Sequence, residues 1–263
     1  MIASLVTLTT DFGLESPYVA AMKGALLSVN PSARLIDLSH QIPPQDIRFA
    51  SYFLAASVPY FPAGTLHVIV VDPGVGTDRA VLYVELASQR LLAPDNGCLT
   101  ALLEAKGPPK SVRRVQDRDY WRDQVSDTFH GRDIFAPVAG HLSLGLKPAK
   151  LGSLAREWIA LDTPKPIRTS NGIQGEVLFI DHFGNLITNI PGHLMHQPPS
   201  CLTIGKRRQR RFSWVRTYGE AKESDLALLI SSFGNVEVAV VGGHAAKRLG
   251  AAVGTGVVVG FPD

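Results

Sequence analysis

The sequence predicts an α/β domain with a central, mostly parallel sheet, followed by a smaller all-β domain that resembles a barrel. Two observations lead to this prediction. Up to about residue 165, strand-like apolar segments alternate with segments of helical spacing, which is typical of α/β folds. After a proline-rich linker at 163–166, short strand-like segments follow one another without a long helix. We therefore expect domains at residues 1–165 and 166–263.

Hydrophobic periodicity predicts the elements of the first domain in order. Val19, Met22 and Leu26 have helical spacing, and Asn30-Pro31 ends that helix. The segment from Leu66 onward is almost all apolar, as in a strand buried on both faces of a parallel sheet. The same reasoning predicts strands at 3–8, 34–38, 66–71, 81–86 and 90–93, and helices at 16–29, 46–60, 97–106 and 129–144.

Turn residues separate the elements expected in the second domain. Strands are predicted at 175–181, 186–190, 201–204, 210–217, 226–231, 236–241 and 256–260. A glycine-rich hairpin is expected at 242–246. Because no long helix interrupts these segments, they favour a barrel or sandwich.

Composition and charge exclude several classes of function. Of the 263 residues, 45% are hydrophobic and 19% charged, and the net charge is only +3, which does not indicate nucleic-acid binding. The basic run Lys206–Arg211 is more typical of a solvated hairpin tip. Cys98 and Cys201 have no paired spacing, as expected of reduced thiols. We find neither a signal peptide nor an apolar run of membrane-spanning length, so a cytoplasmic protein without membrane partners is expected.

Polar side chains follow the predicted strands where an open α/β sheet binds its ligands. Asp11 follows the first strand, Asp72 and Arg79 follow the third, and His130 precedes the last helix. Each also has a structural interpretation: Asp72-Pro-Gly is common turn chemistry, Asp11 could cap a helix, and His130 could be structural. The glycines at 74 and 76 match neither a dinucleotide fingerprint nor a P-loop.

A second candidate motif lies in the β domain, at Asp181-His-Phe-Gly-Asn185. Its structural interpretation is a hairpin turn with glycine at positive φ. Its functional interpretation is an aromatic face from Phe183 beside the Asn185 amide, a combination suited to a purine base.

Taken together, seven motifs in order resemble the S-adenosyl-L-methionine (SAM) hydrolases, also called SAM hydroxide adenosyltransferases, which are related to the SAM-dependent fluorinase and chlorinase. The resemblance spans nearly the whole chain. The motifs are Thr9-Thr-Asp-Phe-Gly13, Ser39-His-Gln-Ile-Pro-Pro-Gln45, Val71-Asp-Pro-Gly-Val-Gly76 with Arg79, Pro94-Asp-Asn-Gly97, Phe129-His-Gly-Arg-Asp133, Asp181 with Phe183-Gly-Asn185, and Ser232-Phe-Gly234.

This resemblance implies an activity and a set of residue roles. The expected reaction is cleavage of SAM by water, at the ribose 5′ carbon, to adenosine and L-methionine, with no cofactor and no metal. Its hydrolytic triad falls on Asp72, Arg79 and His130. Substrate contacts fall on Asp11 for the ribose, Asp181 and Ser232 for methionine, and Phe183, Asn185 and Ala245 for adenine. It also implies a homotrimer with sites at subunit interfaces.

Two positions depart from the family pattern, because Ser231 and His244 stand where asparagine is usual. Three other activities stay open. A related halogenase is disfavoured because the Asp72 carboxylate would repel a halide ion. A metal-dependent phosphoesterase would use Asp11, Asp72, Asn96 and His130 as ligands. An RNA-binding module would use the run Lys206–Arg211.

Overall fold

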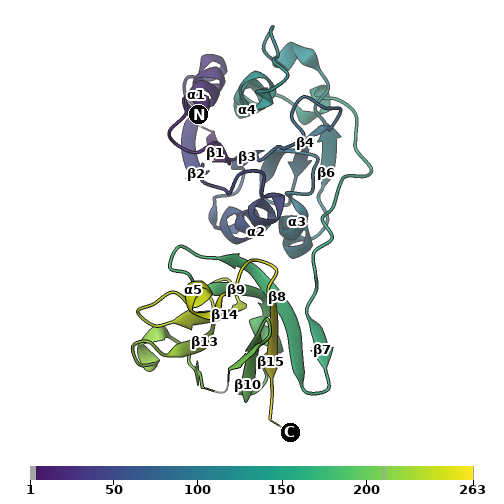
Figure 1. Cartoon of the computed structure of the whole chain (residues 1–263). Coiled ribbons are helices and arrows are strands. Elements are labelled where there is room, and N and C mark those ends of the chain that lie inside the picture. Colours follow the sequence, from purple (N-terminus) through teal and green to yellow (C-terminus); the bar gives the residue numbers. More distant parts are fainter. Residues whose placement is uncertain (1–3, 210, 263) are drawn as a thin grey trace. The chain divides into compact units, whose positions relative to one another are not determined.

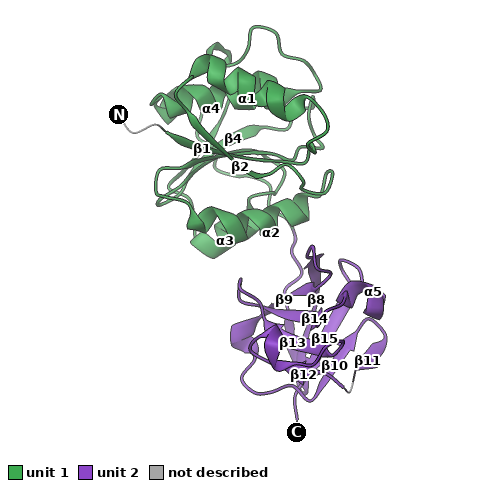
Figure 2. Cartoon of the chain, turned by 90° about the vertical axis from the view of Figure 1, so that its left-hand side faces the viewer, with its two compact units in different colours: residues 1–161 green, residues 162–263 purple. Residues whose placement is uncertain are grey.

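The computed structural model describes residues 4–209 and 211–262, and the chain divides into two compact units, residues 1–161 and 162–263 (Figures 1 and 2). Each unit has its own apolar core. Within the part of the chain that is described, no helix combines the length and the apolar character needed to cross a membrane.

The first unit contains the mostly parallel sheet that the sequence predicts. Its strands are β1 (Leu5–Thr10), β2 (Arg34–Ser39), β3 (Leu66–Val70), β4 (Val81–Glu85), β5 (Arg90–Pro94) and β6 (Ser111–Arg114), in the order β2-β1-β3-β5-β4-β6. The pairs β1–β2, β1–β3 and β3–β5 are parallel, whereas β4 runs antiparallel to β5 and β6. Strand β6 was not predicted, because its sequence, Ser-Val-Arg-Arg, lacks an apolar pattern.

Helices cover both faces of this sheet (Figure 2). Helices α1 (Tyr18–Val29) and α4 (Ala136–Ser143) pack on one face, and α2 (Ile47–Ser57) and α3 (Thr100–Lys106) pack on the other. Asp46 fixes the start of α2, because its carboxylate accepts a hydrogen bond from the Phe49 backbone N–H at 2.8 Å. The predicted helix at 129–144 is correct in place, but it opens with a π-helical turn over Gly131–Phe135.

The strand order places β1 and β3 side by side and parallel. The connection from β1 to β2 passes through α1 on one face, and the connection from β2 to β3 passes through α2 on the other. The carboxyl ends of β1 and β3 therefore lie at the same edge of the sheet, which is where open α/β sheets bind ligands. Asp11 directly follows β1, and Asp72 lies two residues beyond the end of β3.

The second unit is a curled, mostly antiparallel sheet in which only the pair β12–β13 is parallel among the described strands, as expected of a barrel-like domain (Figure 1). Its order is β11-β10-β15-β8-β9-β14-β13-β12, with β7 paired to β8. The bounds are β7 Ile167–Thr169, β8 Gly172–Ile180, β9 Leu186–Pro191, β10 Cys201–Ile204, β11 Arg207–Gln209, β12 Ser213–Trp214, β13 Leu226–Ile230, β14 Asn235–Val240 and β15 Gly256–Gly260.

Three sequence expectations in this unit need correction. The glycine-rich segment at 242–246 is not a plain hairpin, because α5 (Ala245–Leu249) begins within it. Only Ser213–Trp214 of the strand expected at 210–217 is extended, and residue 210 lies outside the described residues. In the basic run, the turn occupies residues 205–206, and Arg207–Gln209 form the edge strand β11 rather than a hairpin tip.

A buried histidine should make the first unit sensitive to acid. His67 on β3 is fully buried between the hydroxyl of Thr7, 2.7 Å from Nδ1, and the amide oxygen of Gln89, 3.3 Å from Nε2. Burial lowers the pKa of His67 from 6.5 to about 4, although the Gln89 hydrogen bond opposes that shift. Unfolding exposes the ring and restores its ordinary pKa, so protons favour the unfolded chain.

Between pH 6.5 and pH 4 this one group is expected to reduce the free energy of unfolding by about 1.4 kcal/mol per pH unit. Above pH 6.5 the stabilisation is complete, and below pH 4 no further loss arises from His67. Urea denaturation at several pH values measures the slope. His67→Gln should flatten it, whereas His193→Gln, at an exposed position, should not. An unchanged slope in His67→Gln would refute the assignment.

Candidate active site

An ion pair between Asp72 and Arg79 lies at the carboxyl end of β3. The Arg79 Nε donates to both carboxylate oxygens of Asp72 at 2.9 Å, and Nη2 donates to Oδ2 as well. Only 4% of the Asp72 side chain and 9% of the Arg79 side chain are exposed to solvent. The turn between them folds Arg79 back, because Val75 N donates to Asp72 O and Thr77 N to Gly74 O. The bidentate pairing fixes the guanidinium plane.

His130 completes the cluster from a distant part of the chain. Its Nδ1 lies 3.0 Å from Arg79 Nη2, although the two residues are 51 positions apart. A guanidinium has only donors, so Nδ1 must be the acceptor and the neutral ring carries its proton on Nε2. Burial, and then the charge of Arg79, lower the pKa of His130 below its ordinary value of 6.5. The ring is therefore neutral at pH 7 and presents Nε2–H as a donor.

The segment that carries His130 is anchored by a buried carboxylate. Asp133 is fully buried in the π-helical turn, and its Oδ2 accepts hydrogen bonds from the backbone N and the hydroxyl of Ser126, both at 3.0 Å. Arg132 donates to the same carboxylate. Burial alone would raise the pKa of Asp133, but the bonds from Arg132 and Ser126 outweigh it and lower that pKa to about 2. Asp133 stays ionised and holds the loop before His130.

Phe135, from the same turn, lies under the guanidinium of Arg79. The Arg79 Cζ is 5.6 Å from the ring centroid, and the ring itself is fully buried. A cation over an aromatic face is favourable, and more so where water is excluded. The π-helical turn thus contacts Arg79 through Phe135 as well as through His130.

Gly76 permits the close approach of two loops in this site. Its φ is +78°, and a Cβ there would lie 2.2 Å from the Asp127 backbone oxygen. Gly76→Ala is therefore expected to displace the loop before His130 and to reduce kcat by at least about 10-fold, the loss that small misplacements of catalytic groups produce. Gly64→Ala is the matched control, because φ is +82° there and no atom lies within 4 Å of the Cβ.

Both variants should lose about 1 kcal/mol of stability from the left-handed backbone, and Gly76→Ala should lose more because of its contact with Asp127. Thermal unfolding measures this shared effect, and only Gly76→Ala should also lose activity. Equal activity in the two variants would show that the contact with Asp127 has no role in catalysis.

The other predicted groups at this edge of the sheet already have structural partners. Asp11 accepts a hydrogen bond from the Gln45 backbone N at 2.8 Å through Oδ2. The Asn96 amide donates to Val71 O at 2.9 Å, and its oxygen accepts from Cys98 N. Asn96 thus ties down the end of β3 and is not free to ligate a metal. Among the described residues, no three His, Cys, Asp or Glu side chains are placed to hold a metal ion.

In the second unit, the predicted adenine and methionine residues cluster at the β8–β9 turn. Asp181 accepts hydrogen bonds from the backbone N of Asn185 at 2.8 Å and from its side-chain amide at 3.1 Å. Phe183, at the tip, is 74% exposed. The start of α5 lies against this turn, since Ala246 N donates to Gly184 O at 2.9 Å. Ala245 is therefore brought close to Phe183 and Asn185.

His244, one of the departures from the family pattern, has a structural role at this turn. Its Nδ1 accepts a hydrogen bond from Lys247 N and so caps α5. The ring packs on Gly184, where any side chain would meet it, because a Cβ would lie 2.1 Å from His244 Nδ1.

Among the described contacts, none joins Ser232 to Asp181, the other residue predicted to bind the methionine part of the substrate. It lies in the β13–β14 turn, and Asn235, which follows, pairs with Pro191 at the end of β9. Asp181 precedes the start of β9, where Leu186 pairs with Val238. The two residues therefore flank opposite ends of the β9–β14 ladder. The adjacent Ser231 is buried, and its hydroxyl accepts from Asn235 N at 3.3 Å.

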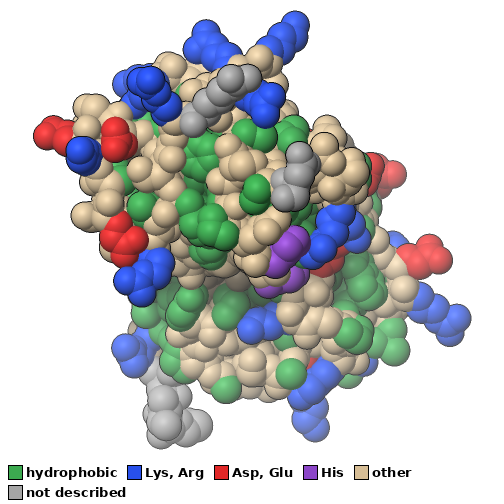
Figure 3. All heavy atoms as spheres, turned by 90° about the horizontal axis from the view of Figure 1, so that it is seen from below, with side chains coloured by type: hydrophobic (Ala, Val, Ile, Leu, Met, Phe, Trp, Pro, Cys, Tyr) green, Lys and Arg blue, Asp and Glu red, His purple; other side chains and the backbone are tan. Residues whose placement is uncertain are grey.

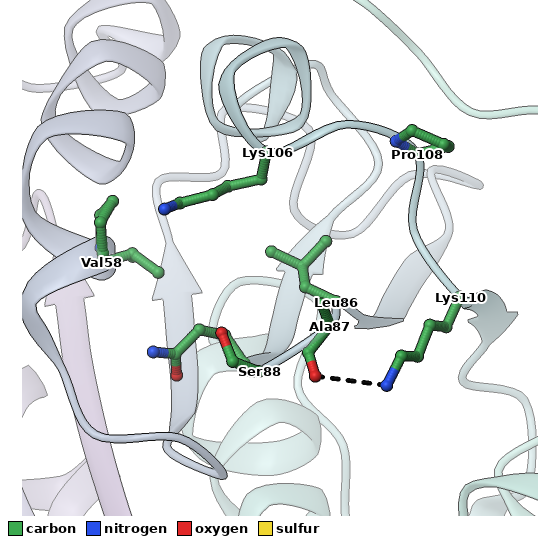
Figure 4. A pocket seen from close by; sticks show the side chains of 9 residues that line it. Val58, Leu86, Ala87, Ser88, Lys106, Pro108 and Lys110 are labelled. Atoms are coloured by element: carbon green, nitrogen blue, oxygen red, sulfur yellow. Dashed lines mark hydrogen bonds between the residues drawn. The ribbon is translucent and has the colours of Figure 1, made fainter.

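A small cavity of about 110 Å³ lies elsewhere in the first unit (Figure 4). Val58, Leu86, Ser88, Lys106 and Lys110 are among its lining residues, and Lys110 Nζ donates to Ala87 O at 3.2 Å. It lies beside the β4–β5 turn, at the amino end of β5. Because β5 is parallel to β3, this is the edge of the sheet opposite Asp72.

Models of the two domains of one protein family match the two units of the chain. The model of the SAM hydroxide adenosyltransferase N-terminal domain matches residues 6–152, and that of the C-terminal domain matches residues 175–258. The chain belongs to the SAM hydroxide adenosyltransferase family. The family resemblance of the sequence motifs is thereby confirmed.

Relatives of this family cover nearly the whole chain. The "(R)-S-adenosyl-L-methionine hydrolase" of Salinispora tropica is 39% identical over 251 residues, 95% of each chain. A crystal structure of an uncharacterized conserved protein from Thermotoga maritima superposes with a TM-score of 0.91 at 34% identity, covering 97% of this chain and 99% of the other. A fluorinase of Actinoplanes sp. is 28% identical over 213 residues, 71% of each chain.

Sequence reasoning assigned no role to two residues that the structure places beside these groups. Asp133 anchors the loop before His130, and His40 contacts the end of β1 next to Asp11. Both stand within motifs that carry the family resemblance. The available signal for Asp133 was a carboxylate three residues after a candidate catalytic histidine, directly before the apolar stretch of the predicted helix.

Proposed function

We propose that this protein hydrolyses the (R)-sulfonium diastereomer of SAM with water, giving adenosine and L-methionine, with Asp72, Arg79 and His130 as the water-handling groups. The observation that carries the proposal is the buried Asp72–Arg79–His130 cluster in a chain that is 39% identical to a curated (R)-S-adenosyl-L-methionine hydrolase. The sulfonium configuration is taken from that relative's name.

The hydrogen-bond pattern leaves donors of Arg79 and His130 available to bind the attacking water. Arg79 uses Nε and Nη2 for Asp72 and His130, so among its contacts in the described residues Nη1 remains for a water. His130 offers Nε2–H. Two donors that bind the same oxygen would favour hydroxide over water, because they would stabilise the negative charge. Asp72 orients Arg79 and offsets its charge in a nearly dry site.

The balance of the reaction follows from this arrangement. The water oxygen bonds to the ribose 5′ carbon as the bond from that carbon to sulfur breaks. Methionine leaves as a neutral thioether, so the leaving group needs no proton. One proton of the water is released to solvent and the other stays on the 5′ hydroxyl of adenosine. A low-dielectric site favours this step, because attack by hydroxide on a sulfonium neutralises opposite charges.

The substrate contacts proposed for the remaining residues are Asp11 with the ribose, Phe183, Asn185 and Ala245 with adenine, and Asp181 and Ser232 with methionine. Support comes from the clustering of the adenine-side residues at the β8–β9 turn. Since the nitrogen of the Asn185 side-chain amide donates to Asp181, its oxygen is the atom we assign to adenine.

We further propose a cytoplasmic homotrimer in which each site combines the α/β domain of one subunit with the β domain of its neighbour. Light scattering after size-exclusion chromatography measures the oligomeric state. Mixing two inactive variants, Asp72→Ala and Asp181→Ala, tests site sharing. Dissociation and reassembly together should restore part of the activity, because some sites then combine two intact domains. A monomer, or no restoration, would contradict this assembly.

The function itself is tested by incubating the purified protein separately with (R)- and (S)-SAM. Adenosine and methionine are expected from the (R) diastereomer at equal yields, and activity should survive a chelator because no cofactor or metal is proposed. Parallel reactions with chloride or fluoride test the halogenase alternative through 5′-halo-5′-deoxyadenosine. Absence of adenosine from both diastereomers would refute the proposal.

RNA binding through Lys206–Arg211 is a separate alternative, in which Arg207–Gln209 would contribute from the edge strand β11. On the face shown in Figure 3, Lys and Arg side chains are interspersed with Asp and Glu and with uncharged side chains, rather than joined into one basic surface. Phosphate-dominated binding relies on such a continuous surface.

A further inference from the structure

A series of side-chain contacts, buried at one end and exposed at the other, connects the carboxyl end of β1 to β2 and α1. The Thr10 hydroxyl lies 2.9 Å from His40 Nδ1. His40 Nε2 lies 3.0 Å from Asp37 Oδ1, and Asp37 Oδ2 accepts from Lys23 Nζ at 2.6 Å. Thr10 is fully buried and His40 is 3% exposed, whereas Asp37 and Lys23 reach the surface. The series therefore runs from the surface of α1 and β2 to the residue before Asp11.

For a neutral His40 ring, hydrogen-bond valence gives the direction of these contacts. Nε2 lies at ion-pair distance from the Asp37 carboxylate, which can only accept, so the proton is assigned to Nε2. In the neutral ring Nδ1 is then an acceptor, and the Thr10 hydroxyl donates to it. The Thr10 oxygen in turn accepts from Phe12 N at 3.3 Å. The Thr10 hydroxyl thus both donates and accepts a hydrogen bond. Through Phe12 it holds the backbone directly after Asp11.

The segment from His40 to Gln45 also holds Asp11 in place through hydrogen bonds of its backbone. Gly13 N donates to the His40 carbonyl at 2.8 Å, and Gln45 N donates to Asp11 Oδ2 at 2.8 Å. Gln45 adopts φ +63°, a left-handed conformation that is strained for a residue with a side chain. The register of β1 and β2 shifts just before Thr9, as at a β-bulge, a device that re-aims side chains next to functional sites.

We infer that Thr10 and His40 are positioning residues that hold the Asp11 carboxylate in place for the ribose hydroxyls of the substrate. This inference rests on the proposed function. Asp11 itself would touch the ligand, since a carboxylate with Oδ1 unused by Gln45 can accept hydrogen bonds from a vicinal diol. Thr10 and His40 act only through it, by fixing the backbone on both sides of Asp11.

The same strand contains an internal control for this idea. Thr7, three residues earlier on β1, is also fully buried, and its hydroxyl lies 2.7 Å from Nδ1 of another histidine, His67. That pair continues to Gln89, at the opposite edge of the sheet, and contacts no candidate site residue. Thr7→Val and Thr10→Val therefore remove equivalent threonine–histidine bonds, three residues apart on one strand.

The test measures the affinities of adenosine and of 2′,3′-dideoxyadenosine by calorimetry on the assembled protein. The wild type should prefer adenosine. Thr10→Val is expected to lower the affinity for adenosine about 10-fold and to leave the affinity for dideoxyadenosine unchanged. A 10-fold loss is the size expected when a charge-assisted hydrogen bond is misplaced. Thr7→Val should keep the wild-type ratio of the two affinities, although its melting temperature also falls. Asp11→Ala defines the ratio expected when ribose recognition is absent.

Two substitutions at His40 provide a second route if Thr10→Val folds poorly. An asparagine side chain would keep an acceptor near the position of Nδ1, so His40→Asn should retain most of the preference for adenosine. A glutamine side chain would reach Asp37 rather than Thr10, so His40→Gln should lose it. Equal weakening of both nucleosides in Thr10→Val, or an unchanged ratio, would overturn the inference alone. Failure of the wild type to bind either nucleoside would overturn the proposed function and the inference together.

Discussion

Replacing His130 by alanine is expected to lower kcat for SAM hydrolysis by about 10²- to 10⁴-fold with little change in KM, the range for loss of a group acting on a proton in the transition state. His130→Asn should retain much more activity than His130→Ala. An asparagine oxygen can accept from Arg79 as Nδ1 does, and its amide, which is too short to reach the position of Nε2, can donate through an intervening water. Steady-state kinetics on the three proteins makes the comparison.

The asparagine variant separates two roles for His130. A neutral donor that helps to hold hydroxide can be replaced by an amide, whereas a general base cannot, because an amide does not take up a proton at pH 7. Equal inactivity of both variants would contradict the donor role. His141→Ala is the control, because His141 also has a lowered pKa and sits on the adjacent α4, without contacting Arg79.

The pH dependence of kcat gives an independent check on His130. Its pKa lies below 6.5, first because of burial and then because of the Arg79 charge. Below that pKa the ring is protonated, loses its acceptor on Nδ1 and is repelled by Arg79. Activity should therefore fall as the pH decreases through a value below 6.5, and this acid limb should disappear in His130→Asn.

Replacing Asp72 by alanine is expected to reduce kcat by about 10²-fold or more, and also to destabilise the fold by about 3–5 kcal/mol, because it leaves the buried Arg79 charge unpaired. Arg79 would lose its bidentate anchor and with it the fixed position of Nη1. Asp72→Asn keeps one acceptor and should be less severe in stability. Kinetics and urea denaturation measure the two effects separately.

Asp78→Ala is the matched control for Asp72→Ala. Asp78 lies in the same turn, next to Arg79, but it is exposed, and its removal changes the net charge by the same amount. It should leave both kcat and stability nearly unchanged. An Asp72→Ala variant with full activity would contradict the role proposed for the ion pair.

The sequence by itself determined the parts of this protein that local pattern encodes. Apolar runs such as Leu66–Val70 and the helical spacing of Val19, Met22 and Leu26 predicted the α/β unit, because strands and helices bury side chains with different periods. Turn chemistry located Asp72, and ordered motifs predicted the family. Strand β6 and helix α5 were missed because their short sequences carry no such period.

Only the tertiary structure decided which of these groups meet. Sheet order places Asp11 and Asp72 at the carboxyl ends of neighbouring strands, and the π-helical turn brings His130 to Arg79 across 51 residues. The tautomer of His130, the capping role of His244 and the contacts of His40 with Thr10 all depend on such distant pairings. Hydrogen-bond valence and burial act between residues that are neighbours in space, and spacing along the chain does not specify them.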